Sequence, residues 1–443
     1  MMGPNVDLVS SSAEFPAETE VVVVGGGIIG VATALSLVSR GVPTVLLEKG
    51  LVAAEQSSRN WGWCRRTGRD LRELPLINLS MQLWEGMNQR LGRETGFGIT
   101  GIAYAARSEK QWLRHQRWRE EARQYDIHSD LLDRDQLQAR FPDLQGAFNG
   151  ALFTALDGRA EPQKAAPAMV MAAQQLGLNL QQHCAVRSIE QAAGKVSEVV
   201  TERGTIRCRA VVVAGGAWSR LLMQGCGLTL PQLKVLSAVF RTSPTDYDPG
   251  LCISFGKVAL RKRRDRGLTV ASSATSISDL TPDSVRFSRL YMPAYREERQ
   301  SINLRFGSRF WEELTRWRVG EPDKISLYER IRVLDPRPEA KVVRAIRQNL
   351  VDTLPGLASV AIEQSWGGFI DTMPDAIPVI SAIDTRAGLF LATGFSGHGF
   401  GIAPGAGQLM ADLVTGSMPS VDAHPFRFSR FTDGENIRAQ HWL

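Results

Sequence analysis

Cysteine is scarce in this chain, and its pattern excludes two classes of protein. No two cysteines form a C-x-x-C pair, which excludes a zinc ribbon and argues against a small fold held together by disulfides. We therefore expect reduced thiols, no bound metal and a cytoplasmic location. The 443 residues hold five cysteines, an odd and widely spaced set: Cys64, Cys184, Cys208, Cys226 and Cys252.

Long apolar runs are also missing. Residues 21–39 are nearly uncharged and long enough to raise the alternative of a membrane helix. Their glycine cluster and the β-type residues at 44–47 argue against that alternative. Residues 1–17 contain Gly, Pro, Asn, Asp and Ser without a basic start or an apolar centre, so we expect a disordered lead-in rather than a signal peptide.

Neither positive nor negative charge is concentrated in one part of the chain. The net charge is +6, and arginines scattered along the whole chain do not form the footprint of a nucleic-acid-binding protein. The exception is the run from Arg261 to Arg266, which lies between two β-type segments and predicts a hairpin. Two interpretations stay open: a solvated hairpin face, or a contact with an anionic partner such as a membrane leaflet or an acidic subunit.

Glycine is clustered where a phosphate-binding turn needs it. Residues 21–24 predict a buried strand, residues 28–39 a helix, and residues 43–48 a second strand that ends in Glu48. In such a unit Gly25 permits the tight turn and Gly27 lets the backbone approach a pyrophosphate. Gly30 allows close packing of helix on strand, and Glu48 accepts hydrogen bonds from a ribose. The whole pattern predicts a dinucleotide-binding unit.

The dinucleotide-binding domain is predicted to be discontinuous. Its strand, glycine-turn and helix pattern returns twice along the chain, whereas the intervening residues read as shorter strands and charged helices. We predict an α/β protein: a Rossmann-like domain built from residues 18–90, 155–231 and 351–443, and an α+β substrate domain with an antiparallel or mixed sheet, built from residues 91–154 and 232–350.

Three separated stretches carry a resemblance to a known family. They are the N-terminal glycine fingerprint, the sequence VVAGGAWS at 212–219, and a C-terminal block with WGGFIDTMPD at 366–375 and GFSGHGFG at 394–401. Together they resemble the D-amino-acid oxidase superfamily of FAD-dependent oxidoreductases. The most similar branch holds glycine oxidase, sarcosine oxidase, D-amino-acid dehydrogenase and γ-glutamylputrescine oxidase. The resemblance covers residues 18–420 and implies FAD rather than NAD.

The resemblance also implies which residues contact the FAD. The loop at 56–68 matches the family's loop past the pyrophosphate and the flavin ring, and Val186 matches the adenine-contacting position. His398 is implied to be structural, with a general base as the alternative role. The full implied set is Gly25, Gly27, Ile28, Ile29, Gly30, Glu48, Lys49, Ser57, Ser58, Arg59, Asn60, Gly62, Trp63, Val186, Ala214, Gly215, Gly216, Trp218, Gly368, Gly394, Ser396, Gly397, His398, Gly399, Phe400 and Gly401.

Departures from the family concern the flavin attachment and the substrate. Sarcosine oxidases with covalent flavin carry a cysteine where this chain has residues 367–369, so FAD is expected to bind non-covalently. The family's carboxylate-binding cations are replaced by Ile370 and Gly401. An apolar residue cannot offset the burial of a carboxylate, so either Arg65 or Arg66 supplies the cation or the substrate is an amine without an adjacent carboxylate.

The implied reaction is oxidation of the C–N bond of an amine or amino acid by hydride transfer to flavin N5. The resulting imine hydrolyses to a carbonyl product, and the electrons pass to O2 or to a quinone. We predict that Asp371 and Asp375 form turns and are not an acid–base pair. The alternative function is a non-catalytic or docking flavoprotein subunit of a larger dehydrogenase complex.

Overall fold

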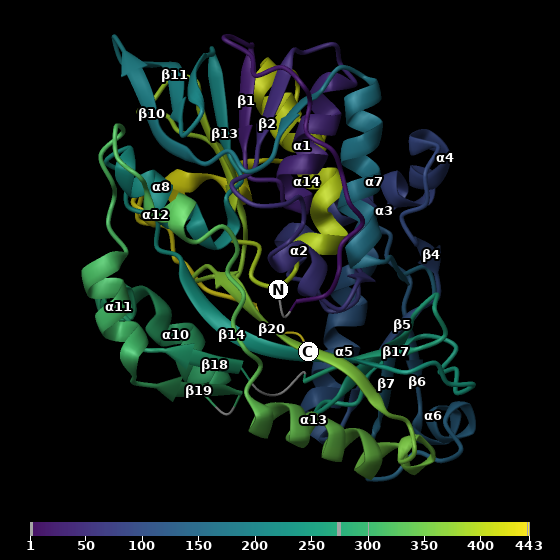
Figure 1. Cartoon of the computed structure of the whole chain (residues 1–443). Helices are drawn as coiled ribbons and strands as arrows, with labels where there is room; N and C mark the ends of the chain where they lie inside the picture. Colours follow the sequence, from purple (N-terminus) through teal and green to yellow (C-terminus); the bar gives the residue numbers. More distant parts are fainter. Residues whose placement is uncertain (1–2, 273–275, 300, 441, 443) are drawn as a thin grey trace.

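Two large β-sheets organise the molecule, as the computed structural model shows (Figure 1). The structure describes residues 3–272, 276–299, 301–440 and 442. A six-stranded sheet lies in the upper part of the view and a ten-stranded sheet in the lower part. Segments from the beginning, middle and end of the chain build the six-stranded sheet, so the predicted discontinuous arrangement of the nucleotide domain is seen in its strand order.

β1 lies inside the six-stranded sheet because its four valines are buried on both faces. Val21 and Val23 face one apolar core, whereas Val22 and Val24 face another, as the alternation of side chains along a strand requires. All neighbouring strands are parallel except β21, which runs antiparallel to β22. The strand order is β21 (Val379–Ala382), β22 (Leu389–Thr393), β13 (Ala210–Val213), β1 (Val21–Val24), β2 (Thr44–Leu47) and β9 (Asn179–Gln181).

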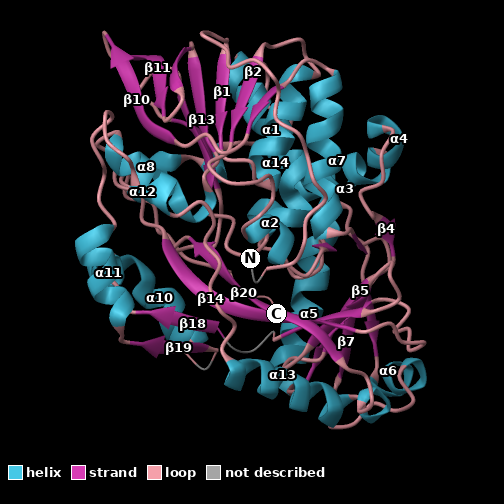
Figure 2. Cartoon of the chain, viewed as in Figure 1, coloured by secondary structure: helices cyan, strands magenta, loops and turns pink. Residues whose placement is uncertain are grey.

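Helices cover one face of this sheet and an antiparallel three-stranded sheet covers the other (Figure 2). The two helices α1 and α14 pack closely, because a Cβ added to Gly407 would lie 2.4 Å from the carbonyl carbon of Ala32. The covering elements are α1 (Ile28–Val38), α3 (Leu74–Glu85), α7 (Pro162–Gln175) and α14 (Gly399–Thr415) on one face, and β10 (Val186–Ala192), β11 (Lys195–Thr201), β12 (Gly204–Arg207) and α8 (Ser219–Gly225) on the other.

The ten-stranded sheet is mixed, which confirms the predicted sheet type. Two neighbouring pairs, β15 with β5 and β18 with β19, are parallel, and the other pairs are antiparallel. The order is β19 (Ile302–Arg305), β18 (Ser276–Asp279), β14 (Leu233–Thr242), β17 (Leu268–Ala271), β16 (Ala259–Lys262), β15 (Cys252–Ser254), β5 (Ile102–Ala106), β7 (Gly150–Thr154) and β6 (Asp130–Leu132), with β20 (Ile362–Thr372) paired to β14.

β20 departs from the predicted division of the chain. We assigned residues after 351 to the nucleotide domain, but β20 pairs along nearly its whole length with β14, from Thr372 opposite Leu233 to Ile362 opposite Thr242. The remaining elements are short strands and mostly peripheral helices: β3 (Trp63–Cys64), β8 (Gly158–Arg159), β4 (Gly98–Ile99), α2 (Gln56–Arg59), α4 (Met87–Leu91), α5 (Glu109–Ala122), α6 (Arg134–Arg140), α9 (Pro282–Arg286), α10 (Ser288–Glu298), α11 (Ser308–Arg316), α12 (Leu327–Arg330) and α13 (Ala340–Thr353).

The N-terminal residues are ordered, contrary to the predicted disordered lead-in. Residues 1–2 lie outside the described part of the chain, but the residues that follow run along the edge of the nucleotide domain. Ser12 N donates to Leu180 O at 2.8 Å, and its hydroxyl accepts from Leu180 N at 3.0 Å. Gln182 is held in the same way by Ser11 and Val9. These bonds hold the N-terminal segment beside the edge strand β9, and such distant partners are not visible in the sequence pattern.

The basic run forms the predicted hairpin, but its side chains are not arranged as predicted. Arg261 is buried and pairs with Glu161 through two 3.0 Å contacts. Arg263 is also buried, and Lys262 donates to two backbone carbonyls. Arg264 and Arg266 remain at the surface and pair with acidic residues. Neither the solvated hairpin face nor the basic contact surface therefore describes the run as a whole.

Among the helices that the structure describes, none unites the length and the apolar character that crossing a bilayer demands.

Candidate active site

A cavity of about 1920 Å³ lies between the two sheets. Its walls come from the carboxyl ends of β1 and β13 on one side and from β14 and β20 on the other. In open α/β sheets ligands bind at this edge. Pockets for drug-sized ligands have about 300–1,000 Å³, so this cavity has room for a dinucleotide together with a substrate.

The glycine turn after β1 has the predicted geometry. Gly25 adopts a φ of +113°, and a Cβ there would lie 2.4 Å from the carbonyl oxygen of Ala214. A Cβ on Gly30 would lie 2.0 Å from the oxygen of Gly25. Both positions therefore require glycine, and α1 begins directly behind the turn at Ile28. The start of this helix faces the cavity with its positive dipole end, where a phosphate is stabilised.

Glu48 is fixed at the end of β2 by two backbone donors. Its Oε2 accepts from Gly26 N and its Oε1 from Gly50 N, both at 2.7 Å. Burial raises the pKa of this carboxyl group, while the charge of Lys49 and the two hydrogen bonds act in the opposite direction. A carboxylate offers about four acceptor positions, so Glu48 keeps acceptor capacity toward the cavity that it borders.

The loop after β2 brings aromatic and polar groups to the cavity. Asn60 holds the loop through Ser57 O at 2.8 Å and Gly62 N at 2.7 Å. Trp61 and Trp63 meet edge to face at 5.2 Å between ring centroids, and Trp63 meets Tyr104 in the same way at 5.6 Å. All three rings border the cavity and form one aromatic wall.

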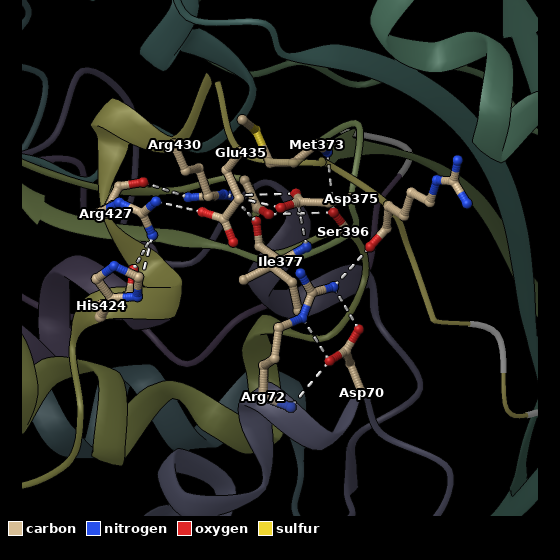
Figure 3. A network of polar contacts seen from close by, with 12 residues as sticks. Asp70, Arg72, Met373, Asp375, Ile377, Ser396, His424, Arg427, Arg430 and Glu435 are labelled. Carbon is tan, nitrogen blue, oxygen red and sulfur yellow. Dashed lines mark hydrogen bonds and ion pairs between the residues drawn. The ribbon is translucent and has the colours of Figure 1, made fainter. Parts of the chain in front are cut away.

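The C-terminal glycine block joins β22 to α14 and borders the cavity from the opposite side. Asp371 on β20 stabilises the turn, because its Oδ2 accepts from Gly394 N and from Gln232 Nε2 at 2.9 Å each. Asp375 is buried and pairs with Arg430 (Figure 3). Both aspartates have structural partners, in agreement with the prediction that they do not form an acid–base pair.

Most of the residues predicted to contact the cofactor border the cavity. Five do not, and they serve as close-packing or framework positions behind it: Gly30, Ser58, Gly62, Gly394 and Gly401. Those that border it are Gly25, Gly27, Ile28, Ile29, Glu48, Lys49, Ser57, Arg59, Asn60, Trp63, Val186, Ala214, Gly215, Gly216, Trp218, Gly368, Ser396, Gly397, His398, Gly399 and Phe400.

The two arginines predicted as candidates for the substrate site point in different directions. Arg65 borders the cavity, with its guanidinium 5.3 Å from the ring centroid of Tyr104. Arg66 turns away, because its Nε donates to Asn78 at 2.9 Å and its Nη1 to Leu156 O at 3.0 Å. Its residue does not border the cavity, so Arg66 is wrong as a pocket candidate. Ile370 borders the cavity as predicted.

Behind His398 lies a buried pair of ionisable residues that the sequence interpretation missed. Arg69 Nη2 donates to His398 O at 3.0 Å, and Arg69 Nη1 lies 3.9 Å from Glu73 Oε2. Burial lowers the pKa of Arg69 to about 10 and raises the pKa of Glu73 to about 7. The spacing of four residues between Arg69 and Glu73 was the available signal, since such pairs meet on a helical turn.

His398 itself is half-buried, and its environment disfavours the charged ring. Burial, followed by the charges of Arg69 and Arg65, lowers its pKa. Its Nδ1 lies 3.8 Å from Glu73 Oε2, and no described atom is within hydrogen-bonding distance of that nitrogen. A neutral imidazole at the start of α14 fits a packing role, as the resemblance implied.

The parallel sheet, its glycine turn and the cavity at its carboxyl edge define a two-domain dinucleotide-binding protein. The chain belongs to the DAO family of FAD dependent oxidoreductases, whose family model matches residues 20–413. This membership confirms the resemblance carried by the glycine turn and the C-terminal block. FAD is the cofactor of the family.

Known relatives align over nearly the whole chain. Glycine oxidase of Pseudomonas putida is 24% identical over 430 residues, which cover 92% of this chain and 97% of the relative. Sarcosine oxidase subunit beta of Rhizobium meliloti is 25% identical over 425 residues, covering 94% and 89%. The structure of L-amino acid deaminase from Proteus myxofaciens in complex with anthranilate is similar with a TM-score of 0.91 and 29% identity, covering 97% of both chains.

Proposed function

We propose that FAD occupies this cavity non-covalently and that the chain oxidises the carbon–nitrogen bond of an amino acid. Bound FAD supplies the redox chemistry, which converts this bond to an imine that water hydrolyses to a carbonyl compound. Relatives named for glycine and sarcosine oxidation and for L-amino acid deamination support this class of reaction. The chain's own residues bind, orient and shield the reactants.

The nucleotide end of the cavity fits the ADP half of FAD. The turn from Gly25 to Gly27 exposes backbone to a pyrophosphate without interfering side chains. Glu48, held by its two backbone donors, has acceptor positions left for ribose hydroxyls. Val186 and Trp218 border the same end and offer apolar surface to a base.

The other end fits the flavin ring. α14 points its N-terminus, with Gly397 and Gly399, at the cavity, and this positive dipole end stabilises negative charge on a reduced ring. Cys64 is buried, does not border the cavity, and has a pKa well above its usual value because of burial. Its thiolate is therefore scarce, which supports non-covalent binding.

The position of Arg65 at the cavity wall is the observation that supports an amino acid as the substrate. One of its N–H groups donates to the carbonyl of Thr67, which holds the guanidinium against Tyr104 at the cavity wall. A guanidinium is the preferred partner of a carboxylate. Ile370 and the wall of Trp61, Trp63 and Tyr104 supply the apolar remainder of the pocket.

The test is an anaerobic reduction experiment with the purified yellow protein. Amino acids are expected to bleach the flavin absorbance, and amines without a carboxylate to bleach it poorly. Arg65→Met is expected to raise KM for the amino acid about 10- to 100-fold, because a hydrogen bond to a charged group contributes about 1.5–3 kcal/mol. Arg66→Met removes the same charge outside the cavity and serves as the matched control.

The opposite outcomes are equally clear. Bleaching by amines alone would overturn the carboxylate role of Arg65. Absorbance that survives every amine and amino acid would favour the alternative, a non-catalytic or docking subunit. Yellow colour in the pellet after acid precipitation would overturn non-covalent binding.

The electron acceptor and the location belong to the same proposal. We infer that electrons pass to O2 or to a quinone and that the chain works in the cytoplasm. The five cysteines, all of them free thiols, fit a reducing compartment. Adding O2 or a water-soluble quinone separately to the bleached protein, and recording which restores the absorbance, identifies the acceptor.

A further inference from the structure

A short segment of the second domain crosses onto the nucleotide end of the cavity. Residues 326–335, here called the strap, include α12 and lead toward α13. Tyr328 of the strap is buried and borders the cavity, and its ring meets Trp218 at 5.6 Å between centroids. The strap is therefore part of the wall of the dinucleotide site.

The residues just after Glu48 hold the backbone of the strap. Lys49 Nζ donates to Ile331 O at 3.0 Å and to Arg332 O at 2.8 Å. A Cβ on Gly50 would lie 2.5 Å from Arg332 O, so strap and turn are in direct contact. Glu55 accepts from Leu334 N at 3.0 Å.

Three ion pairs fasten the strap along its length. Arg187 forms two 2.9 Å contacts with Glu329 of the strap. Arg332 of the strap pairs with Glu202 through both carboxylate oxygens, and Asp335 pairs with Arg59 at 2.9 Å. All the partners outside the strap belong to the nucleotide domain or its flavin loop, so these pairs tie the strap to that domain beside the cavity.

An aromatic stack strengthens the same closure. Trp218 lies between Lys49, whose Nζ is 4.3 Å from its ring centroid, and Trp317, whose ring stacks on it at 4.7 Å. Lys234 in turn lies 3.7 Å above Trp317. The stack connects the residue after Glu48 to the chain that leads into the strap.

We infer that the strap is a gate that retains FAD. Tyr328 of the strap forms part of the cavity wall at the nucleotide end, and a dinucleotide with its ADP half at Glu48 is taken up and released there when the strap lifts. The ion pairs resist this movement, because partly buried pairs are screened less and contribute more than exposed ones. The inference needs FAD in the cavity but no particular substrate, and it therefore stands separately from the proposed reaction.

The test compares FAD exchange rates in a strap variant and a control. The double variant Glu202→Gln and Glu329→Gln removes two charges of the strap's ion pairs while keeping side-chain size. Glu363→Gln removes an exposed pair with Arg241 elsewhere and is the control. Release is followed by the rise of flavin fluorescence in dilute holoprotein, with excess ADP to block rebinding. Uptake is followed by fluorescence quenching when FAD is mixed with the apoprotein.

A gate changes both rates. We expect the double variant to release FAD about tenfold faster or more and to take it up faster as well, while the control keeps the rates of the unmodified protein.

Other results overturn the gate. Unchanged release in the variant contradicts it, and so does faster release without faster uptake, since that identifies a simple contact with FAD. Should the double variant fail to fold, the single variants Glu202→Gln and Glu329→Gln, measured in the same way, decide. Anaerobic bleaching by substrate, measured on the same samples, shows separately whether the proposed reaction occurs.

Discussion

Among single residues, Glu73 has a direct consequence for pH dependence. Burial raises its pKa from 4.5 to about 7, so between these values the folded protein keeps a proton that the unfolded chain has released. The contribution of Glu73 to stability is then greatest at low pH and falls as the pH rises toward 7, by up to about 3 kcal/mol. Above pH 7 the folded protein carries a buried carboxylate beside Arg69.

Glu73→Gln should remove this slope. We expect the difference in unfolding free energy between about pH 5 and about pH 8 to shrink in the variant, whatever happens to the absolute stability. Urea unfolding curves at both pH values measure the difference, with Glu363→Gln as a surface control. An unchanged slope in Glu73→Gln would show that this carboxyl group does not titrate as described.

Residue-level prediction from the sequence succeeded for some positions and failed for their neighbours. Arg65 and Arg66 are consecutive, and in extended chain consecutive side chains point to opposite sides. In an irregular loop the sequence does not show which of two consecutive side chains points toward the cavity. It therefore could not distinguish Arg65 from Arg66. Gly25 was predictable because its conformation and its close approach to Ala214 leave no alternative residue.

At the scale of elements, the first β-α-β unit depends on two glycines of very different sensitivity. Gly25→Ala places a Cβ 2.4 Å from a backbone oxygen at a φ of +113°. We expect it to abolish FAD binding, measured by the flavin-to-protein absorbance ratio after purification. Gly41 has a φ of +75°, but no atom lies within 4 Å of a Cβ added at this position in Gly41→Ala. It should cost about 1 kcal/mol of stability and leave the ratio unchanged, and equal flavin loss in both would refute the steric explanation.

Elements with local patterns were predicted well, and those with distant partners were not. β1, α1 and β2 lie at the predicted places because their patterns are continuous. By contrast, the helical stretch that holds α3 and α4 divides at Gly86. The residues of β20 are predicted to belong to the nucleotide domain, yet the strand pairs with β14 more than a hundred positions earlier, and no local stretch of sequence contains both partners.

At the scale of the whole molecule, Arg261 joins the two domains. Its guanidinium contacts Glu161 at the start of α7 and the carbonyl of Trp61 in the flavin loop. Arg261→Met leaves the carboxylate of Glu161 buried without its main partner. We expect the free energy of unfolding to fall by about 3 kcal/mol. This is the lower end of the range for a broken buried ion pair, because Arg159 still contacts Glu161.

Arg264→Met is the matched control for this pair. Its charge lies on the same hairpin and pairs with Glu94 at the surface, so its loss should stay below about 1 kcal/mol. Urea unfolding of the two holoproteins measures both. Equal losses would mean that the domains are not joined through Arg261.

The close packing of α14 on α1 has a consequence for synthesis of the chain. Arg40, just beyond α1, pairs with Asp412 of α14 at 372 positions' distance along the chain. At about 5–20 residues per second, the ribosome needs roughly 20–75 seconds to deliver the partner helix. Until then the apolar face of α1 that packs against α14 is exposed to water. The part of the cavity wall that α14 forms, at the flavin end, is also missing. FAD therefore binds only after α14 has packed on α1, although the glycines of the turn after β1 are among the first residues synthesised.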